Sequence, residues 1–176
     1  MKSVALFALL FACAFAANHD EDVTQINDMI HYGAQGFETG LYKKDMQVSE
    51  ECAGTWSTDV VDELLTAIED FAKQPQQSAA IIAGDVAQLA VKNYQYCGVD
   101  TTLADLYDFC ITKGKCNVQR LTINVTLNSN KILAAFNDIL TAYQTKPATE
   151  EEFVQQVTQI AENVGEMLQL VTAFKG

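Results

Sequence analysis

Apolar residues recur at spacings of three and four along most of the chain, a pattern typical of amphipathic helices that bury one face. A proline at position 75 falls between two such segments and predicts a short turn between antiparallel helices. The sequence therefore predicts an all-α fold, an antiparallel bundle of five or six helices. The clearest helical segments are 23–32, 58–73, 78–96, a shorter one from 100 to 110, and 149–171.

Several of these helices carry signals for their first turn. Ser78 and Asp100 are the expected N-caps of the third and fourth segments. Thr149 is the expected N-cap of the last, where Glu152 completes a capping box and the neighbouring glutamates suit the positive end of the helix dipole. This helix carries a continuous apolar seam from Phe153 to Val171. The seam must be buried, and packing within the chain is preferred over packing on a neighbouring molecule.

The segment 118–130 supports two interpretations. From Leu121 to Leu127 apolar and polar residues alternate and β-branched residues are frequent, which is typical of a strand. The apolar residues from Val118 to Tyr143 also fit a helical spacing, interrupted only near Asn128. Since a lone strand would have no partner in a helical chain, the preferred interpretation is a helix that is bent or interrupted near Asn128.

The first sixteen residues have the features of a secretory signal peptide. Lys2 is followed by an apolar run from Val4 to Phe15, and Ala14-Phe15-Ala16 fits an A-x-A cleavage site. The run is too short to span a bilayer, which disfavours an uncleaved anchor, and no later stretch reaches transmembrane length. The sequence predicts removal of residues 1–16 and a single secreted domain over residues 17–176.

Charge narrows the range of partners. The formal net charge of −12 becomes −13 when Lys2 leaves with the signal, and so acidic a chain is repelled by nucleic acid and by anionic lipid. Such a chain suits a cationic partner, or weak binding of divalent cations at the acidic clusters 20–22 and 150–152. Neither cluster has the ligand spacing of an EF-hand, and a role as helix N-terminal charge is preferred.

The cysteines predict disulfide bonds. Loss of Cys13 with the signal leaves four, and four cysteines allow three pairings. A hairpin of the second and third helices would bring Cys52 and Cys97 to the same end, while Cys110 and Cys116 flank a short turn, so this pairing is favoured. A metal site is disfavoured because the chain has no C-x-x-C and only two histidines. Trp56 is expected to pack over the Cys52–Cys97 bridge rather than to stack on a ligand.

Three further features concern function. The chain contains no nucleophile elbow, zinc-protease motif, phosphate loop or dinucleotide fingerprint, so we expect no catalytic residues and no cofactor. Asn124-Val125-Thr126 is a glycosylation sequon, and Asn124 must face solvent if it is used; an unused sequon on a packed helix is the alternative. The spacing of Gly36 and Gly40, flanked by Phe37 and Leu41, indicates a candidate assembly surface or a glycine-loosened helix.

The order of several motifs resembles a large group of small secreted α-helical proteins of ciliates and related protists. The motifs are Gly36-Phe37-x-x-Gly40-Leu41, Cys52 before Val60-Val61-x-x-Leu64-x-x-Ala67-Ile68, Cys97 at the end of a helix, and Asn124-x-x-x-Asn128 before Ile132. The resemblance implies a helical fold and a surface, filament or granule location, and no reaction. Cys110 and Cys116 are additions to the two cysteines of that group.

Together these features predict a non-enzymatic secreted structural or interaction protein, with protein partners or self-association, at the cell surface, outside the cell or in a secretory granule. Two alternatives stay open: a carrier of an apolar ligand such as a lipid, and a helical inhibitor or ligand of another protein.

Overall fold

The computed structural model describes residues 19–175, and side-chain surroundings from Val23 onward; the predicted signal peptide lies outside this range. The described residues form helices and no strand. The α-helices are α2 (His19–Tyr42), α3 (Thr55–Glu69), α4 (Pro75–Tyr96), α5 (Val99–Tyr107), α6 (Val118–Gln144) and α7 (Glu150–Thr172), with a 3-10 turn η1 (Asp70–Ala72) after α3 and a π-helical turn η2 (Asp108–Thr112) after α5.

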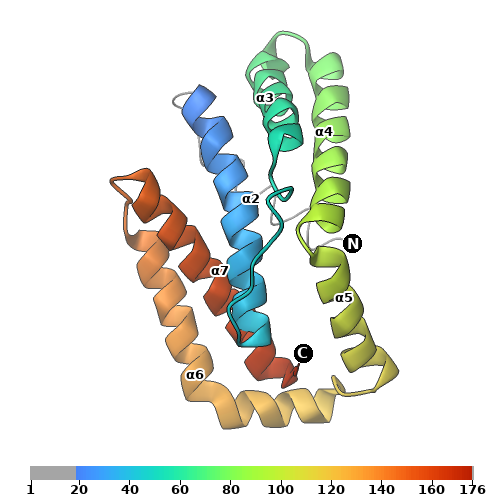
Figure 1. The fold of residues 1–176 in the computed structure, drawn as a ribbon, viewed down its shortest axis with the longest axis vertical. Coiled ribbons are helices and arrows are strands. Elements are labelled where there is room, and N and C mark those ends of the chain that lie inside the picture. The colour runs from blue at the N-terminus through green and yellow to red at the C-terminus, as the bar shows by residue number, and fades with distance from the viewer. Residues whose placement is uncertain (1–18, 176) are drawn as a thin grey trace.

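The helices form an all-α bundle, as the apolar spacing predicts. Helices α2 and α7 lie side by side, the second part of α6 covers the outer side of α7, and the α3–α4 hairpin stands on the other side of α2 (Figure 1). The pairs α3–α4 and α6–α7 are antiparallel, whereas α2 and α7 run in the same direction. The central pair therefore departs from the up-and-down order of a purely antiparallel bundle.

Glycines allow α2 and α7 to approach until their backbones touch. A Cβ added at Gly36 would overlap the carbonyl oxygen of Thr158, and one at Gly165 would overlap that of Phe37. At Gly40 an added Cβ would overlap the carbonyl oxygen of Glu162. The glycine spacing thus marks a close helix–helix contact inside the chain, and α2 continues through these glycines without a break.

Helices α4 and α5 begin at other residues than the sequence predicts. Helix α4 starts at Pro75, with Gln74 as N-cap, so the predicted cap Ser78 lies buried within the helix. Proline is favoured at the first helical position because its missing N–H would be unpaired there in any case. Similarly, α5 starts after Gly98, whose φ of 72° suits glycine, and Asp100 lies in the first turn rather than at the cap.

Two disulfide bonds join Cys52 to Cys97 and Cys110 to Cys116, the pairing that the sequence favours. The first connects the loop before α3 to the end of α4, and both of its cysteines are buried. Trp56 lies at the same end of the hairpin, where its indole N–H donates to the carbonyl of Glu51 at 2.8 Å and its ring lies beside Tyr96. The hairpin is thereby closed at the end opposite its turn.

Segment 118–130 is helical, which excludes the strand interpretation, and Figure 1 shows α6 bent sharply along its length. Hydroxyl groups in the first part of the helix donate to main-chain carbonyls one turn earlier: Thr122 to Val118 and Thr126 to Thr122. Such bonds compete with the helix ladder and favour bending. The amide of Asn128 also donates to the Asn124 carbonyl, at 3.0 Å, in the region where the sequence predicts the bend.

Both ends of α7 are capped by side chains. Thr149 accepts from the N–H of Glu152, as the capping box predicts, and the Glu152 carboxylate accepts from the N–H of Ala148. At the other end, the amides of Asn124 and Asn128 on α6 donate to the carbonyls of Val171 and Leu170, at 3.1 and 3.3 Å. Asparagines one helical turn apart on α6 therefore bind two of the last carbonyls of α7.

Candidate interaction surface

The predicted assembly surface is not exposed. Gly36, Gly40 and Leu41 are buried and Phe37 is half-buried, because α7 lies directly on this face of α2. The glycine motif of α2 is therefore in contact with the backbone of α7 in the same chain. These four residues therefore pack inside the chain and do not form the predicted intermolecular surface. The apolar seam of α7 is likewise packed mainly against α2 and α6.

Two polar contacts hold α5 against α2. Thr102 donates to the carboxylate of the buried Glu38 at 2.6 Å, and the Tyr42 hydroxyl donates to Asp105 at 2.8 Å, one turn along both helices. Burial raises the pKa of the Glu38 carboxyl above its ordinary value, against the effect of the Thr102 hydrogen bond. Burial together with the Asp105 hydrogen bond raises the pKa of Tyr42 to about 12. These contacts fix where α5, and hence the chain leading to α6, leaves the bundle.

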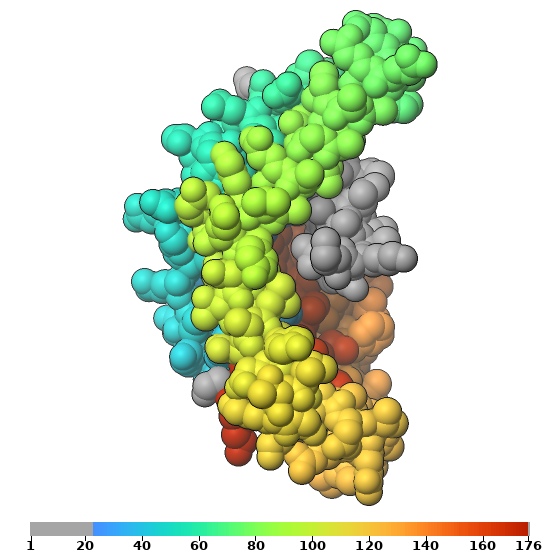
Figure 2. Space-filling model, turned by 90° about the vertical axis from the view of Figure 1, so that its right-hand side faces the viewer, coloured from blue at the N-terminus to red at the C-terminus, as the bar shows by residue number. Residues whose placement is uncertain are grey.

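The exposed apolar side chains are unevenly distributed. Among the described residues sixteen large apolar side chains are exposed; eight belong to α6, whereas α2 and α7 contribute none. The others lie on α3–η1, the end of α4, and α5–η2. Figure 2 shows α4, α5 and the start of α6 forming one continuous outer side of the molecule. Exposed apolar side chains that are concentrated on a few elements indicate an interaction site more strongly than isolated exposed residues do.

The second part of α6 carries the most regular of these surfaces. Leu133, Phe136, Leu140 and Tyr143 follow one another at spacings of three, four and three, so they lie in one row on the helix. They are 59%, 46%, 39% and 78% exposed, respectively. We call these four residues the α6 stripe.

The α6 stripe exists because this helix has two apolar faces and one main neighbour. Ala135 and Ala142 are buried, with Ile132 and Ile139 half-buried on the same side, and these residues pack towards α7. The stripe lies on the adjacent face. Apolar spacing in the sequence does not distinguish the two faces. For this reason the sequence pattern groups Phe136 and Tyr143 with the residues that are buried. The signal that separates them is the pair of parallel rows: one alternates isoleucine with alanine, whose small side chain fits a close helix contact, and the other has large residues only.

The charged residues of α6 avoid the stripe. Lys131 and Asp138, the charged residues of the second part of α6, are seven residues apart, which places them in a single row. At 100° per residue this row lies roughly opposite Phe136 on the helix. The outward face that contains the stripe is therefore free of charge, in a chain whose formal net charge is −12.

The sequon residue Asn124 lies on a packed part of α6. Asn124 is half-buried, and the nitrogen that would carry a glycan donates to the carbonyl of Val171 on α7. A glycan would replace one hydrogen of this amide at the α6–α7 contact. In this packing Asn124 has a structural partner, and glycosylation there stays a prediction.

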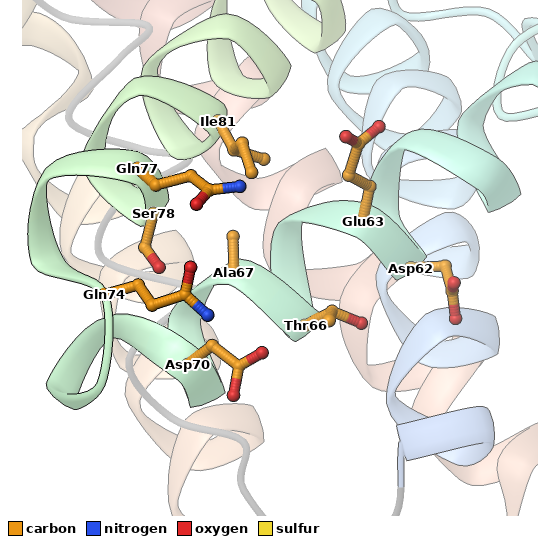
Figure 3. Close-up of a pocket in the computed structure, with 9 residues that line it drawn as sticks. All are labelled: Asp62, Glu63, Thr66, Ala67, Asp70, Gln74, Gln77, Ser78 and Ile81. Atoms are coloured by element: carbon orange, nitrogen blue, oxygen red, sulfur yellow. The ribbon is translucent and has the colours of Figure 1, made fainter.

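The turn of the α3–α4 hairpin forms an open pocket of about 340 Å³, in which seven of the nine lining residues have polar side chains. Its three carboxylates, Asp62, Glu63 and Asp70, diverge rather than converge (Figure 3). No group of His, Cys, Asp and Glu side chains among the described residues could hold a metal ion. Only two of the lining residues, Ala67 and Ile81, have apolar side chains, which does not favour a lipid as the ligand. Its lining residues are Asp62, Glu63, Thr66, Ala67, Asp70, Gln74, Gln77, Ser78 and Ile81.

His31, the one histidine whose side chain is described, has a structural contact. Its Nδ1 donates to the carbonyl of Cys52 at 3.0 Å, and its ring lies edge-on to Tyr32. The imidazole therefore links α2 to the loop that carries the first disulfide bond. This contact supplies no nucleophile for the histidine to activate.

Comparisons with models of protein families, with curated proteins and with solved structures found no match. The motif resemblance to secreted helical proteins of ciliates stays a prediction. Within the described residues, no helix has the length and apolar character needed to cross a membrane.

Proposed function

We propose that this chain is a secreted, non-enzymatic interaction protein that acts through the exposed apolar side chains of α5 and α6. The observation that carries the proposal is their distribution: half of the exposed large apolar residues are on α6, while the central helices α2 and α7 expose none. Such a division supports a scaffold, built around α2 and α7, that presents the exposed apolar side chains of α5 and α6 to a partner.

Secretion is part of the same proposal. It is supported by the features of residues 1–16 and by two disulfide bonds, which persist in oxidising compartments. The pocket at the α3–α4 turn is open and has three carboxylates among its lining residues, so it lends no support to a lipid carrier. The partner-binding role is therefore preferred over the carrier.

The test is expression of the whole chain, with a tag at its C-terminus, in a secreting eukaryotic cell. We expect the chain in the medium with Ala17 as its first residue, and we expect capture on the tag to retain a defined protein. A variant with Tyr107→Ser, Ile111→Ser, Leu133→Ser and Phe136→Ser should be secreted equally well and should lose that protein. Retention inside the cell, or identical capture by both forms, would contradict the proposal. A stoichiometric lipid in native mass spectra of the secreted chain would favour the carrier instead.

A further inference from the structure

We infer that the α6 stripe binds the α6 stripe of a second copy of this chain, the two helices running antiparallel. The inference rests on the proposed function and names its partner. Three observations carry it: the charge of this region, the symmetry of the stripe, and the apolar area that it presents.

The first observation is that α6 lies in the least acidic part of the chain. Between Val118 and Thr149 the sequence has one acidic residue, Asp138, against Arg120, Lys131 and Lys146. Two copies of a chain with a net charge of −12 repel each other over most of their surfaces. They can approach closely where acids are absent, and the charged row of α6 faces away from the stripe. A strongly basic partner would instead be drawn to the acidic surfaces elsewhere.

The second observation is that the stripe is complementary to itself in reverse order. A twofold axis near the level of residue 138 places Phe136 opposite Leu140 of the second copy, and Leu133 opposite Tyr143 of the second copy. Each contact thus joins an aromatic side chain to a leucine. The spacing of three, four and three is that of a seam between two helices crossing at a shallow angle.

The third observation concerns area. Four side chains of these sizes, exposed as observed, present on the order of 500 Å² of apolar surface, since a large aromatic side chain offers about 150–250 Å². A standard stable interface buries about 800 Å² on each partner. The stripe therefore suits a reversible dimer, and we expect a dissociation constant on the order of 1–100 μM.

The test is sedimentation velocity of the secreted, disulfide-bonded chain over concentrations from about 1 to about 500 μM, which span the expected constant. The wild type should pass from monomer to dimer. Phe136→Lys with Leu140→Lys should stay monomeric, because the twofold axis brings the lysines of both copies together. Phe136→Lys with Leu140→Glu should dimerise again, and only at low salt, because each lysine then faces a glutamate of the other copy.

Ile68→Lys with Phe71→Lys is the matched control. These two residues are 42% and 47% exposed but lie on α3 and η1, outside the proposed binding surface, so this variant should dimerise like the wild type. Circular dichroism and the absence of free thiols verify that every variant is folded.

Three results would overturn the inference. The first is a wild type that is monomeric throughout, and the second is a doubly lysine-substituted variant that dimerises as well as the wild type. The third is a charge-paired variant, Phe136→Lys with Leu140→Glu, that fails to dimerise at low salt. A monomeric wild type that still captures a different protein through the stripe would overturn self-pairing and leave the proposed function standing. A wild type that neither dimerises nor captures another protein would reject both the inference and the proposed function.

Discussion

Gly40 and Gly84 are both glycines inside helices, but their surroundings are opposite. A Cβ at Gly40 would overlap the backbone of α7, whereas one at Gly84 on α4 would meet nothing within 4 Å. We expect Gly40→Ala to lower the free energy of unfolding by about 3 kcal/mol, because the backbone contact cannot yield as a side chain would. Gly84→Ala should raise it by about 0.5–1 kcal/mol through helix propensity. Urea denaturation of both variants measures the contrast, and equal effects would contradict the α2–α7 contact.

Glu38 predicts a specific pH dependence. Its pKa is raised by burial in the folded state, so the folded chain holds this proton more tightly than the unfolded chain. The stabilisation of the folded state by the Glu38 proton is fully present at a pH below 4.5, the ordinary pKa of this carboxyl. It is lost as the pH rises through the raised pKa of the folded state.

The variant Glu38→Gln isolates this group. The amide oxygen can still accept from Thr102, so we expect a neutral or stabilising effect at pH 7 and a smaller loss of stability between acid and neutral pH. Thermal denaturation from pH 4 to 8 provides the measurement, with Glu69→Gln at an exposed position as the control. Identical pH profiles for wild type and Glu38→Gln would show that Glu38 stays solvated.

At the scale of elements, the two disulfide bonds close loops of very different length. Cys52 and Cys97 are 45 residues apart, and Cys110 and Cys116 are six apart. The chain-entropy relation assigns about 4 kcal/mol to the longer loop and about 2 kcal/mol to the shorter. We therefore expect replacement of Cys52 and Cys97 by serine to destabilise the fold more than replacement of Cys110 and Cys116.

Guanidinium denaturation of the two double-serine variants measures this difference. The replacement that lowers the free energy of unfolding more identifies the disulfide bond that contributes more to stability. We expect this to be Cys52–Cys97, because both of its cysteines are buried at the base of the α3–α4 hairpin. A larger loss from the Cys110–Cys116 pair would indicate that η2 and the start of α6 depend on local closure more than the hairpin does.

Helix boundaries show what the sequence could and could not predict. The cap at Thr149 was predictable because capping is local chemistry that one turn of sequence contains. The start of α4 was mispredicted because Ser78 and Pro75 are both good first-turn residues, and only tertiary packing buries Ser78. The two neighbouring apolar rows of α6 could be counted from the sequence, but not which row α7 would cover.

At the scale of the whole molecule, the all-α fold and the favoured disulfide pairing followed from apolar spacing and from the order of the cysteines. The parallel pairing of α2 with α7 did not, because it joins segments separated by nearly the whole described chain. The same long sequence separation explains why the glycine motif was assigned to a surface between molecules. Its spacing correctly indicates close helix contact, but spacing carries no information about whether the partner helix belongs to the same molecule.

The contact between α2 and α7 also sets an order of events during synthesis. Gly40 meets Glu162, more than a hundred residues later, so the glycine face of α2 has no partner until α7 has been made. The α3–α4 hairpin and its Cys52–Cys97 bond involve closer segments and can form first. The closest helix–helix contact of the fold is thus expected to form last. Until then, oxidation of the hairpin proceeds on a chain whose first and last described helices are still apart.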